Sequence, residues 1–274
     1  TACAQRLAKP GVNIAVCSAN PERVAELAKK LGKKDVYKTF SKRAQNYRNV
    51  YNPTSTFMQP RDSKGVFQPN YSPDDYTSHI CESNGWHYMW SVQHDVKGLV
   101  KLVGKKRFTE KLDSMFTYSP KANAELPLFS TGMIGQYAQG NEPSHHVAYL
   151  FNKIGQPEKT QKYIYEILTG LYKDTPDGLC GNEDCGQMSA WYVLSALGFY
   201  PLNPVSCQYE LGTPLFKKAT IHLENGKNFV IESENYNIGK YEVESVYING
   251  KKVKDYTIDH KAMMNGGTLT FKMK

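Results

Sequence analysis

The chain has 274 residues and a formal net charge of +8, from 34 basic and 26 acidic side chains. An aromatic content of 12% excludes a disordered chain, and 21 glycines and 14 prolines without a fixed period exclude collagen-like and low-complexity classes. No apolar run approaches the roughly 18 residues that span a bilayer, so we expect no membrane span. Because the lysines are scattered in short pairs, we expect a solvated surface and no nucleic-acid partner.

Two helices and a long loop are expected in the N-terminal part. Pro21 suits the first turn of a helix over 20–31, where apolar residues recur at helical spacing. A second helix is expected over about 35–49. Turn signals follow one another through 50–80, which predicts a loop, and its Tyr and Phe residues argue against disorder.

Helical patterns dominate residues 84–200. One apolar stripe comprises Ile164, Ile167, Leu168 and Leu171. The run 188–197 is apolar nearly all round, which predicts a helix buried on every side. Gly198 can end this helix. We therefore assign residues 1–204 to a helical region.

After about residue 205 the apolar period changes from 3.6 to 2, which is typical of strands. Strands are expected over 219–224 and 228–234, joined by an Asn-Gly turn, and over 243–248, which runs into a second Asn-Gly pair. Residues 268–273 alternate cleanly. The expected architecture of 205–274 is a small antiparallel β module.

Neither the cysteines nor the first residues carry a recognisable signature. The six cysteines have irregular spacing and form no CxxC pair, so we expect neither a disulfide framework nor a zinc site, and the redox compartment stays open. The chain begins without Met, and no charged segment followed by a long apolar run marks a signal peptide.

Three short loops share one chemistry, each combining a carboxylate with an amide and a Gly or Pro at a loop-to-helix junction. They cover 81–95, 140–146 and 177–187. Carboxyl pairs act as acid and base in glycosidases, and amides and aromatic rings suit a sugar. Other readings stay open: Asn182, Glu183 and Asp184 as helix caps, the His145–His146 pair as packing residues, and Trp86 and Trp90 as core residues.

The run GNEDCGQMSAWY at 181–192, followed by SALGFYP at 195–201, resembles the signature of glycoside hydrolase family 92, the calcium-dependent exo-α-mannosidases that invert the anomeric centre. The three loops and the C-terminal segments resemble that family as well, so the likeness covers about 32–274. It implies a mainly α fold, part of a six-hairpin α/α barrel (an α/α toroid) followed by the β module. It also implies an N-terminal β-sandwich and opening barrel helices ahead of this region, expected as a required partner region.

The resemblance implies roles for individual residues. Glu82 matches the general acid and Asp184 the general base, with Asn182 beside the base among the catalytic residues. Residues expected to contact the sugar are Asn84, Trp86, His87, Trp90, Asn141, Glu142 and Glu183. Calcium is the implied cofactor, near Glu142, Asn141 and His145, although a hard cation prefers oxygen and a histidine there would act through water. His87 and Gln93 depart from the family pattern, which expects Gln and Pro at these positions.

The expected function is removal of terminal α-linked mannose, such as α-1,2-linked mannose, from mannan or N-glycan chains by a periplasmic or secreted hydrolase. Its partner would be a mannose-containing oligosaccharide. Two alternatives remain: another α/α-barrel glycosidase or lyase, and a carbohydrate-binding or inactive fragment. The pairing of Glu82 with Asp184 favours hydrolysis, because lyases usually use Tyr, His or Arg as the base.

Overall fold

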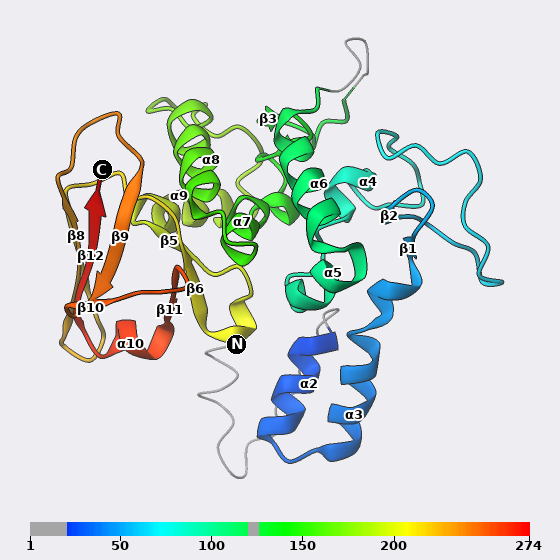
Figure 1. Cartoon of the computed structure of the whole chain (residues 1–274), viewed down its shortest axis with the longest axis horizontal. Helices are drawn as coiled ribbons and strands as arrows, with labels where there is room; N and C mark the ends of the chain where they lie inside the picture. Colours follow the sequence, from blue (N-terminus) through cyan, green and yellow to red (C-terminus); the bar gives the residue numbers. More distant parts are fainter. Residues whose placement is uncertain (1–20, 120–125) are drawn as a thin grey trace. The chain divides into compact units, whose positions relative to one another are not determined.

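A computed structural model describes residues 21–119 and 126–274 (Figure 1). The chain divides into two compact units: one extends to Tyr71 and includes Pro204–Ser206, and the other comprises Ser72–Asn203 and Cys207–Lys274. The second unit contains both the helices after residue 84 and the strands after residue 205. Helices and strands that the sequence pattern assigns to separate regions therefore share one compact unit.

The first unit contains the expected helical pair. α2 (Pro21–Lys30) is present, and residue 20 lies outside the described residues. α3 (Lys34–Arg43) ends earlier than expected and is followed by the 3-10 helix η1 (Asn46–Asn49). A short hairpin of β1 (Tyr51–Asn52) and β2 (Phe57–Met58) interrupts the predicted loop. An acidic residue in the first turn of α3 and basic residues in its last turn suit the helix dipole.

The helices of the second unit follow one another between residues 85 and 196, with one more near the C-terminus. They are α4 (Gly85–Tyr88), α5 (Val96–Val103), α6 (Lys105–Thr117), the 3-10 helices η2 (Glu142–Ser144) and η3 (Val147–Tyr149), α7 (Leu150–Lys153), α8 (Pro157–Gly170), α9 (Gln187–Ala196) and α10 (His260–Met264). The predicted stripe on α8 is confirmed, because Ile164, Ile167 and Leu168 are buried while Leu171, just past the helix end, is half-buried.

The helix α9 has the expected position but not the expected burial. Met188 and Trp191 are buried, whereas Val193 is 55% exposed. Two residues correspond to about 200° of rotation around a helix, so Val193 points away from the face that carries Trp191. Periodicity could not show this, because an apolar residue on either face looks the same in the sequence. Gly198 has a φ of +93° directly beyond the helix end, as expected for a helix terminator.

The strands of the second unit form two sheets and one short hairpin. They are β3 (Met133–Ile134), β4 (Tyr137–Ala138), β5 (Phe199–Tyr200), β6 (Gln208–Leu211), β7 (Lys218–His222), β8 (Asn228–Glu234), β9 (Val243–Ile248), β10 (Lys251–Lys252), β11 (Thr257–Asp259) and β12 (Gly267–Met273). The larger sheet has the order β10-β9-β12-β8-β7, and the smaller has the order β11-β6-β5.

The strands after residue 205 confirm the expected hairpins but correct the expected topology. β7 and β8 pair antiparallel, as do β9 and β10. β12, however, pairs parallel with β8 and antiparallel with β9, so the larger sheet is mixed. Alternation predicts that a segment is a strand, but the direction of its neighbour depends on the path of the chain between them.

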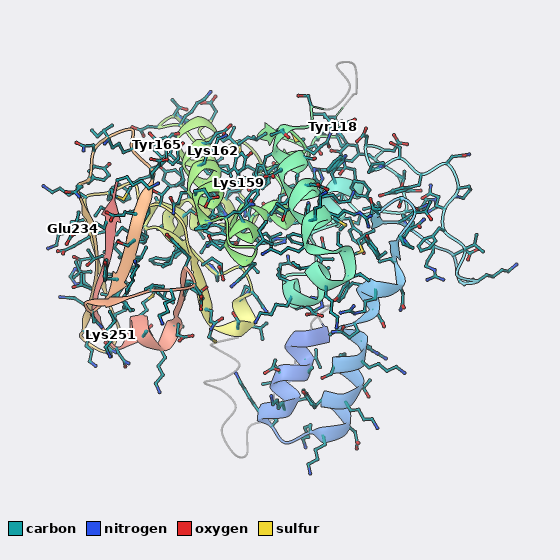
Figure 2. All side chains as sticks on the ribbon, viewed as in Figure 1. Tyr118, Lys159, Lys162, Tyr165, Glu234 and Lys251 are labelled. Carbon is teal, nitrogen blue, oxygen red and sulfur yellow. The ribbon has the colours of Figure 1, made fainter. Side chains whose placement is uncertain are left out.

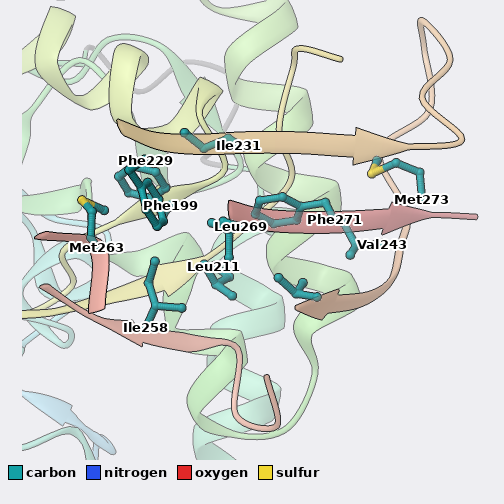
Figure 3. Packing of buried hydrophobic residues seen from close by; sticks show 11 residues of the cluster. Phe199, Leu211, Phe229, Ile231, Val243, Ile258, Met263, Leu269, Phe271 and Met273 are labelled. Atoms are coloured by element: carbon teal, nitrogen blue, oxygen red, sulfur yellow. The ribbon is translucent and has the colours of Figure 1, made fainter. Parts of the chain in front are cut away.

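The core of this β region lies between the two sheets (Figure 3). Leu269, Phe271 and Met273 occupy alternate buried positions of β12, and Phe229 and Ile231 do the same on β8. Leu211 and Ile258 on the smaller sheet complete the same buried cluster. Period-2 burial on β8 and β12 of the larger sheet explains why the sequence alternates in these segments.

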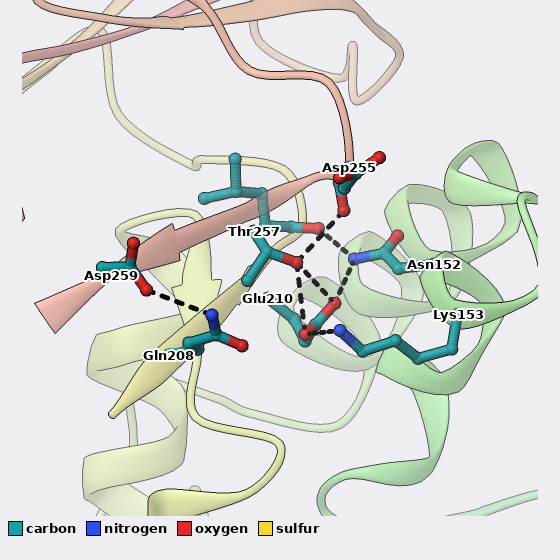
Figure 4. Close-up of polar contacts among 8 residues, drawn as sticks. Asn152, Lys153, Gln208, Glu210, Asp255, Thr257 and Asp259 are labelled. Carbon is teal, nitrogen blue, oxygen red and sulfur yellow. Dashed lines mark hydrogen bonds and ion pairs between the residues drawn. The ribbon is translucent and has the colours of Figure 1, made fainter. Parts of the chain in front are cut away.

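A buried ion pair joins the helices to the smaller sheet (Figure 4). Glu210 on β6 is 3% exposed and pairs with Lys153 of α7. Asn152 Nδ2 donates to the carbonyl oxygen of Leu211 at 2.9 Å, and Thr257 Oγ1 contacts the Glu210 carboxylate at 3.4 Å. Burial raises the pKa of Glu210, and the Lys153 ammonium opposes that shift. Removing Lys153 would therefore leave a buried charge without its main partner.

Charged side chains are exposed on several elements of the second unit. Lys162 on α8 and Lys251 on β10 are both exposed and belong to separate secondary-structure elements (Figure 2). None of the described helices is both long and apolar enough to cross a membrane.

Candidate active site

Carboxylates from all three loops gather in the second unit. Glu142 is half-buried, and burial raises its pKa; Asp184, through charge and a side-chain hydrogen bond, and Glu82, through charge, raise it further. Glu82 and Asp184 are exposed. The loops 81–95, 140–146 and 177–187 therefore bring together one carboxyl group each. The group on the loop 140–146, that of Glu142, is less exposed than the other two.

The two outer carboxylates stand on left-handed backbone. Glu82 has a φ of 46° and Asp184 a φ of 44°, and Cys185 continues with 59°. Asp adopts this conformation more readily than most residues, whereas Glu and Cys adopt it at a cost, and such strain clusters at functional sites. The same unusual backbone at the expected acid and the expected base is consistent with a site in which the direction of the side chain matters more than local stability.

Buried polar side chains hold the loop that carries Glu82 in place. Asn84 caps α4 by accepting from the backbone N–H of His87 at 3.1 Å, and its amide donates to Gln136 Oε1 at 3.2 Å. His87 Nε2 lies 2.7 Å from the Gln136 carbonyl oxygen, and burial lowers the pKa of His87 to about 4. Both side chains are nearly fully buried and support the loop from within, and their expected contact with a sugar stays a prediction.

The two tryptophans of this loop are also inside the protein. Trp90 is 1% exposed and packs edge-on against Phe108. Trp86 is 8% exposed, donates from Nε1 to Asp74 at 2.7 Å, and stacks on Tyr118. Direct stacking of these rings on a sugar, expected from the sequence, is at odds with this burial. The reading of both as core residues fits the structure better.

Asn141 and Glu142 lie where the second loop meets the first. Asn141 is buried and donates from Nδ2 to the Glu82 carbonyl oxygen at 2.9 Å, so it fixes the backbone of the expected acid. Glu142 Oε1 is buried and has no hydrogen-bond partner among the described residues. A buried carboxylate oxygen without a partner carries a desolvation cost, which a bound ligand can relieve.

The histidines that follow are structural. His145 Nε2 lies 2.9 Å from the Gln139 carbonyl oxygen, and its Nδ1 lies 3.2 Å from Gln187 Nε2. His146 Nε2 lies 2.7 Å from the Trp90 carbonyl oxygen. Burial lowers the pKa of both histidines to about 4, so both are neutral near pH 7. With both ring nitrogens of His145 already bonded, the expectation that it ligates a metal is not supported.

The three polar residues of the third loop, 182–184, differ in exposure and in their partners. Asn182 and Asp184 are exposed, but Glu183 is bound within the chain. Its two oxygens accept from the backbone N–H and the hydroxyl of Ser189, at 3.1 and 2.8 Å. This is the behaviour of a residue that caps the first turn of α9, so the capping reading applies to Glu183 rather than the expected sugar contact.

Two glycines allow the second and third loops to touch. A Cβ at Gly181 would lie 2.6 Å from Gly140 Cα, and one at Gly140 would lie 2.8 Å from the Cys180 carbonyl oxygen. Real Cβ atoms do not approach backbone so closely. The backbones of these loops can therefore come together only because both positions lack a side chain.

The donor set around Glu142 suits a hard cation only in part. Within residues 21–119 and 126–274, no group of three His, Cys, Asp or Glu side chains is arranged to hold a metal ion. The unpartnered oxygen of Glu142 is the kind of ligand that calcium takes. Backbone carbonyl groups, water and sugar hydroxyls would have to supply most of the remaining six to eight ligands that are typical of calcium.

Two buried glutamines and the half-buried Gln187, which sequence reasoning did not select as site residues, make hydrogen bonds around the three loops. Gln136 receives Asn84 and His87, Gln139 Nε2 donates to Tyr172 at 2.7 Å, and Gln187 contacts His145. The available signal was weak, because glutamine is usually a surface residue. Their position beside the loop glycines and carboxylates was the only hint.

This arrangement can place two exposed carboxyl groups around a bound sugar, with the half-buried carboxyl group of Glu142 on the loop between them. One exposed carboxyl can donate a proton to a leaving oxygen while the other activates water.

Comparisons with known proteins identify a family. A family model described as the glycosyl hydrolase family 92 catalytic domain matches residues 17–274. A family GH92 alpha-mannosidase from Bacteroides thetaiotaomicron is 40% identical, with a TM-score of 0.86 over 91% of this chain and 33% of that one. A family GH92 inverting mannosidase from Bacteroides thetaiotaomicron VPI-5482 is 36% identical, with a TM-score of 0.82 over 93% and 36%.

A curated relative is also described as a glycosidase. An uncharacterized secreted glycosidase from Arthroderma benhamiae is 28% identical over 92% of this chain and 34% of its own length. The chain thus spans about a third of the length of the relatives that it matches.

Proposed function

Because the chain belongs to glycoside hydrolase family 92, we propose that it hydrolyses terminal α-linked mannose, such as α-1,2-linked mannose, in mannan or N-glycan chains. The observation that carries this proposal is the gathering of Glu82, Glu142 and Asp184 from three separate loops. The likeness to a GH92 alpha-mannosidase at 40% identity supports mannose as the sugar. The secreted glycosidase among its relatives supports a periplasmic or secreted location.

Glu82 is the general acid and Asp184 the general base of the proposed reaction. Glu82 protonates the departing glycosidic oxygen, while Asp184 removes a proton from the water that attacks the opposite face of the sugar. Asn182, exposed beside Asp184, is available to hold that water or a sugar hydroxyl. The expected outcome is inversion at the anomeric carbon, which the inverting relative supports.

Calcium is the proposed cofactor, held by Glu142 through its unpartnered Oε1 atom, with Asn141 beside it. When bound, the cation would grip vicinal hydroxyls of the mannose. Asn141 meanwhile keeps the Glu82 backbone in place through its 2.9 Å hydrogen bond.

We further propose that full activity requires regions like those that make up the other two-thirds of the relatives. In this proposal the helices of the second unit form part of an α/α toroid. The exposure of Val193 on α9 supports it, because an apolar helix face in such a toroid packs against a neighbouring helix. A chain that binds mannose without cleaving it is the competing outcome.

The test is hydrolysis of two α-mannosides, one with an activated aryl leaving group and one with a sugar leaving group. Glu82→Gln should abolish turnover of the sugar-linked substrate but spare part of the aryl turnover, because a good leaving group needs little protonation. Proton NMR of the first-formed mannose should show the inverted anomer. Equal loss on both substrates, or release of the retained anomer, would overturn these roles. Binding of mannose without turnover in the unmodified chain would leave only a carbohydrate-binding function.

A further inference from the structure

The loops that carry Glu142 and Asp184 are joined by one side-chain hydrogen bond between His145 and Gln187. Asp184 stands three residues before Gln187, and the Gln187 backbone N–H donates to the Asp184 carbonyl oxygen at 3.3 Å. Glu142 stands three residues before His145, and the His145 backbone N–H donates to the Glu142 carbonyl oxygen at 3.1 Å. Each carboxylate is thus one short turn away from the residue that holds its loop to the other.

The protonation of His145 makes this bond directional. The Gln139 carbonyl oxygen can only accept, so His145 Nε2, at 2.9 Å, carries the ring proton. Nδ1 of the neutral ring is then an acceptor, and it needs a donor at 3.2 Å, which is the amide nitrogen of Gln187. That nitrogen also lies 3.0 Å from the Tyr200 hydroxyl. The two partners orient the amide of Gln187.

A second residue of the helix α9 also makes a hydrogen bond to His145. Trp191 Nε1 donates to the His145 carbonyl oxygen at 2.9 Å. Gln187 and Trp191 are four residues apart, so they lie on the same face of the helix. His145 is 1% exposed and is therefore held in a dry environment, where hydrogen bonds are costly to break.

From these contacts we infer that Gln187 is a positioning residue, which sets the placement of Asp184 relative to Glu142 by holding His145. This inference rests on the proposed hydrolase function for its kinetic consequence only. Gln187 is half-buried and does not belong to the expected catalytic set. A displacement of about 1 Å between reacting groups can lower a rate by roughly two orders of magnitude.

The test compares Gln187→Met with Tyr200→Phe in the full 274-residue chain. Gln187→Met keeps the length of the side chain but removes the donor to His145, whereas Tyr200→Phe removes only the other partner of Gln187. On an aryl α-mannoside, Gln187→Met should lower kcat roughly 10- to 100-fold and leave KM within about twofold, because it changes the transition state more than substrate binding. Tyr200→Phe should retain kcat within about threefold. Thermal unfolding should show both variants folded at the assay temperature.

Two NMR readouts do not depend on turnover. The ring nitrogen shifts of His145 should change in Gln187→Met as Nδ1 loses its donor, and the Trp191 indole N–H should exchange faster. Neither should change in Tyr200→Phe. If Gln187→Met does not fold, Trp191→Phe removes the second hydrogen bond to His145, and its His145 shifts and kcat should change in the same directions.

The outcomes separate the two claims. An unmodified chain that neither binds nor cleaves a mannoside overturns the proposed function, whereas the NMR readouts decide the positioning role whether or not the chain turns over a substrate. Gln187→Met with the kcat of the unmodified chain, or with unchanged His145 and Trp191 signals, overturns the positioning role. So does a Tyr200→Phe variant that loses as much as Gln187→Met, because the loss would then reflect packing around Gln187 rather than its bond to His145.

Discussion

The carboxyl group of Glu142 lies close enough to that of Asp184 for the two groups to affect each other's ionisation, although the residues belong to different loops of the chain. Burial, this proximity and the nearby charge of Glu82 all raise the pKa of Glu142. Two carboxylates that share a site cannot both ionise easily. The ionisation of Glu142 therefore depends on the charge of Asp184.

Replacing Asp184 by Asn should lower the pKa of Glu142. The change removes the like charge, so the ionised form of Glu142 becomes more favourable. Only part of the shift should disappear, because burial is its largest cause and remains. Carbon-13 NMR titration of the Glu142 carboxyl group in the presence of a chelator measures this pKa. The Glu183→Gln variant is the control. A Glu142 pKa that does not fall in Asp184→Asn would show that the two groups are not coupled.

Glycine at position 82 should stabilise the chain relative to alanine, while both variants lose turnover of the sugar-linked substrate. Glu82 has a φ of 46°, a conformation that costs alanine roughly 1 kcal/mol more than glycine. Thermal unfolding of Glu82→Gly and Glu82→Ala measures the difference. The same pair of substitutions at Glu142, which starts the 3-10 helix η2, should favour alanine. Equal unfolding temperatures for the two variants at position 82 would argue against a strained backbone there.

Gly181→Ala should separate the second and third loops. Its Cβ would lie 2.6 Å from Gly140 Cα, so one backbone must move. We expect a loss of about 1–3 kcal/mol in the free energy of unfolding, as for overpacking, together with a large loss of turnover. Gly170→Ala is the matched control: it has open space around it in α8 and should be neutral or stabilising by up to about 1 kcal/mol. Comparable denaturation midpoints for the two variants would contradict the close approach.

Stability should fall steeply between pH 6.5 and 4. His87, His145 and His146 are buried, and burial lowers the pKa of each to about 4 from an ordinary 6.5. The folded state therefore binds fewer protons than the unfolded state in this range, so their stabilisation is present above pH 6.5 and is lost as the pH falls through 4. Each shift corresponds to roughly 3 kcal/mol.

The slope of the unfolding free energy against pH measures this uptake of protons, and the contribution of the three histidines should approach three protons near pH 5. Glu210 and Glu142 act in the opposite direction, because their raised pKa values favour the folded state at low pH, but they are two groups against three and reduce the net slope without reversing it. His146→Asn should reduce the slope by about one proton, whereas His222→Asn, at an exposed position, should not change it. A flat profile between pH 6.5 and 4 would contradict the buried, neutral state of these histidines.

Chelation should remove activity, and calcium should restore it better than zinc, because Glu142 offers an unpartnered oxygen whereas both ring nitrogens of His145 already have partners. Glu142→Gln should weaken calcium binding at least tenfold in a calorimetric titration. Glu183→Gln should not, since both oxygens of Glu183 are already bound by Ser189. Undiminished activity after exhaustive chelation would reject the metal but not the acid and base.

Local patterns predicted much of the secondary structure. The turn between β7 and β8, the strand β9 and the end of α9 at Gly198 all lie where the residues indicate. Each depends on interactions between neighbours in the sequence, such as an Asn-Gly turn or alternation of apolar residues. The sequence pattern also identified the three loops, because each joins a carboxylate to a turn residue.

Amino-acid order alone therefore specifies many of the helices, the main strands after residue 205 and the family signature at 181–192. It does not specify which polar residues are buried, since Trp90, Asn84 and Glu183 look like ligand contacts until their partners are known. It also does not specify that β12 runs parallel to β8, or that Glu142 meets Asp184. These relationships join residues far apart in the chain, and only the packing of the folded protein brings them together.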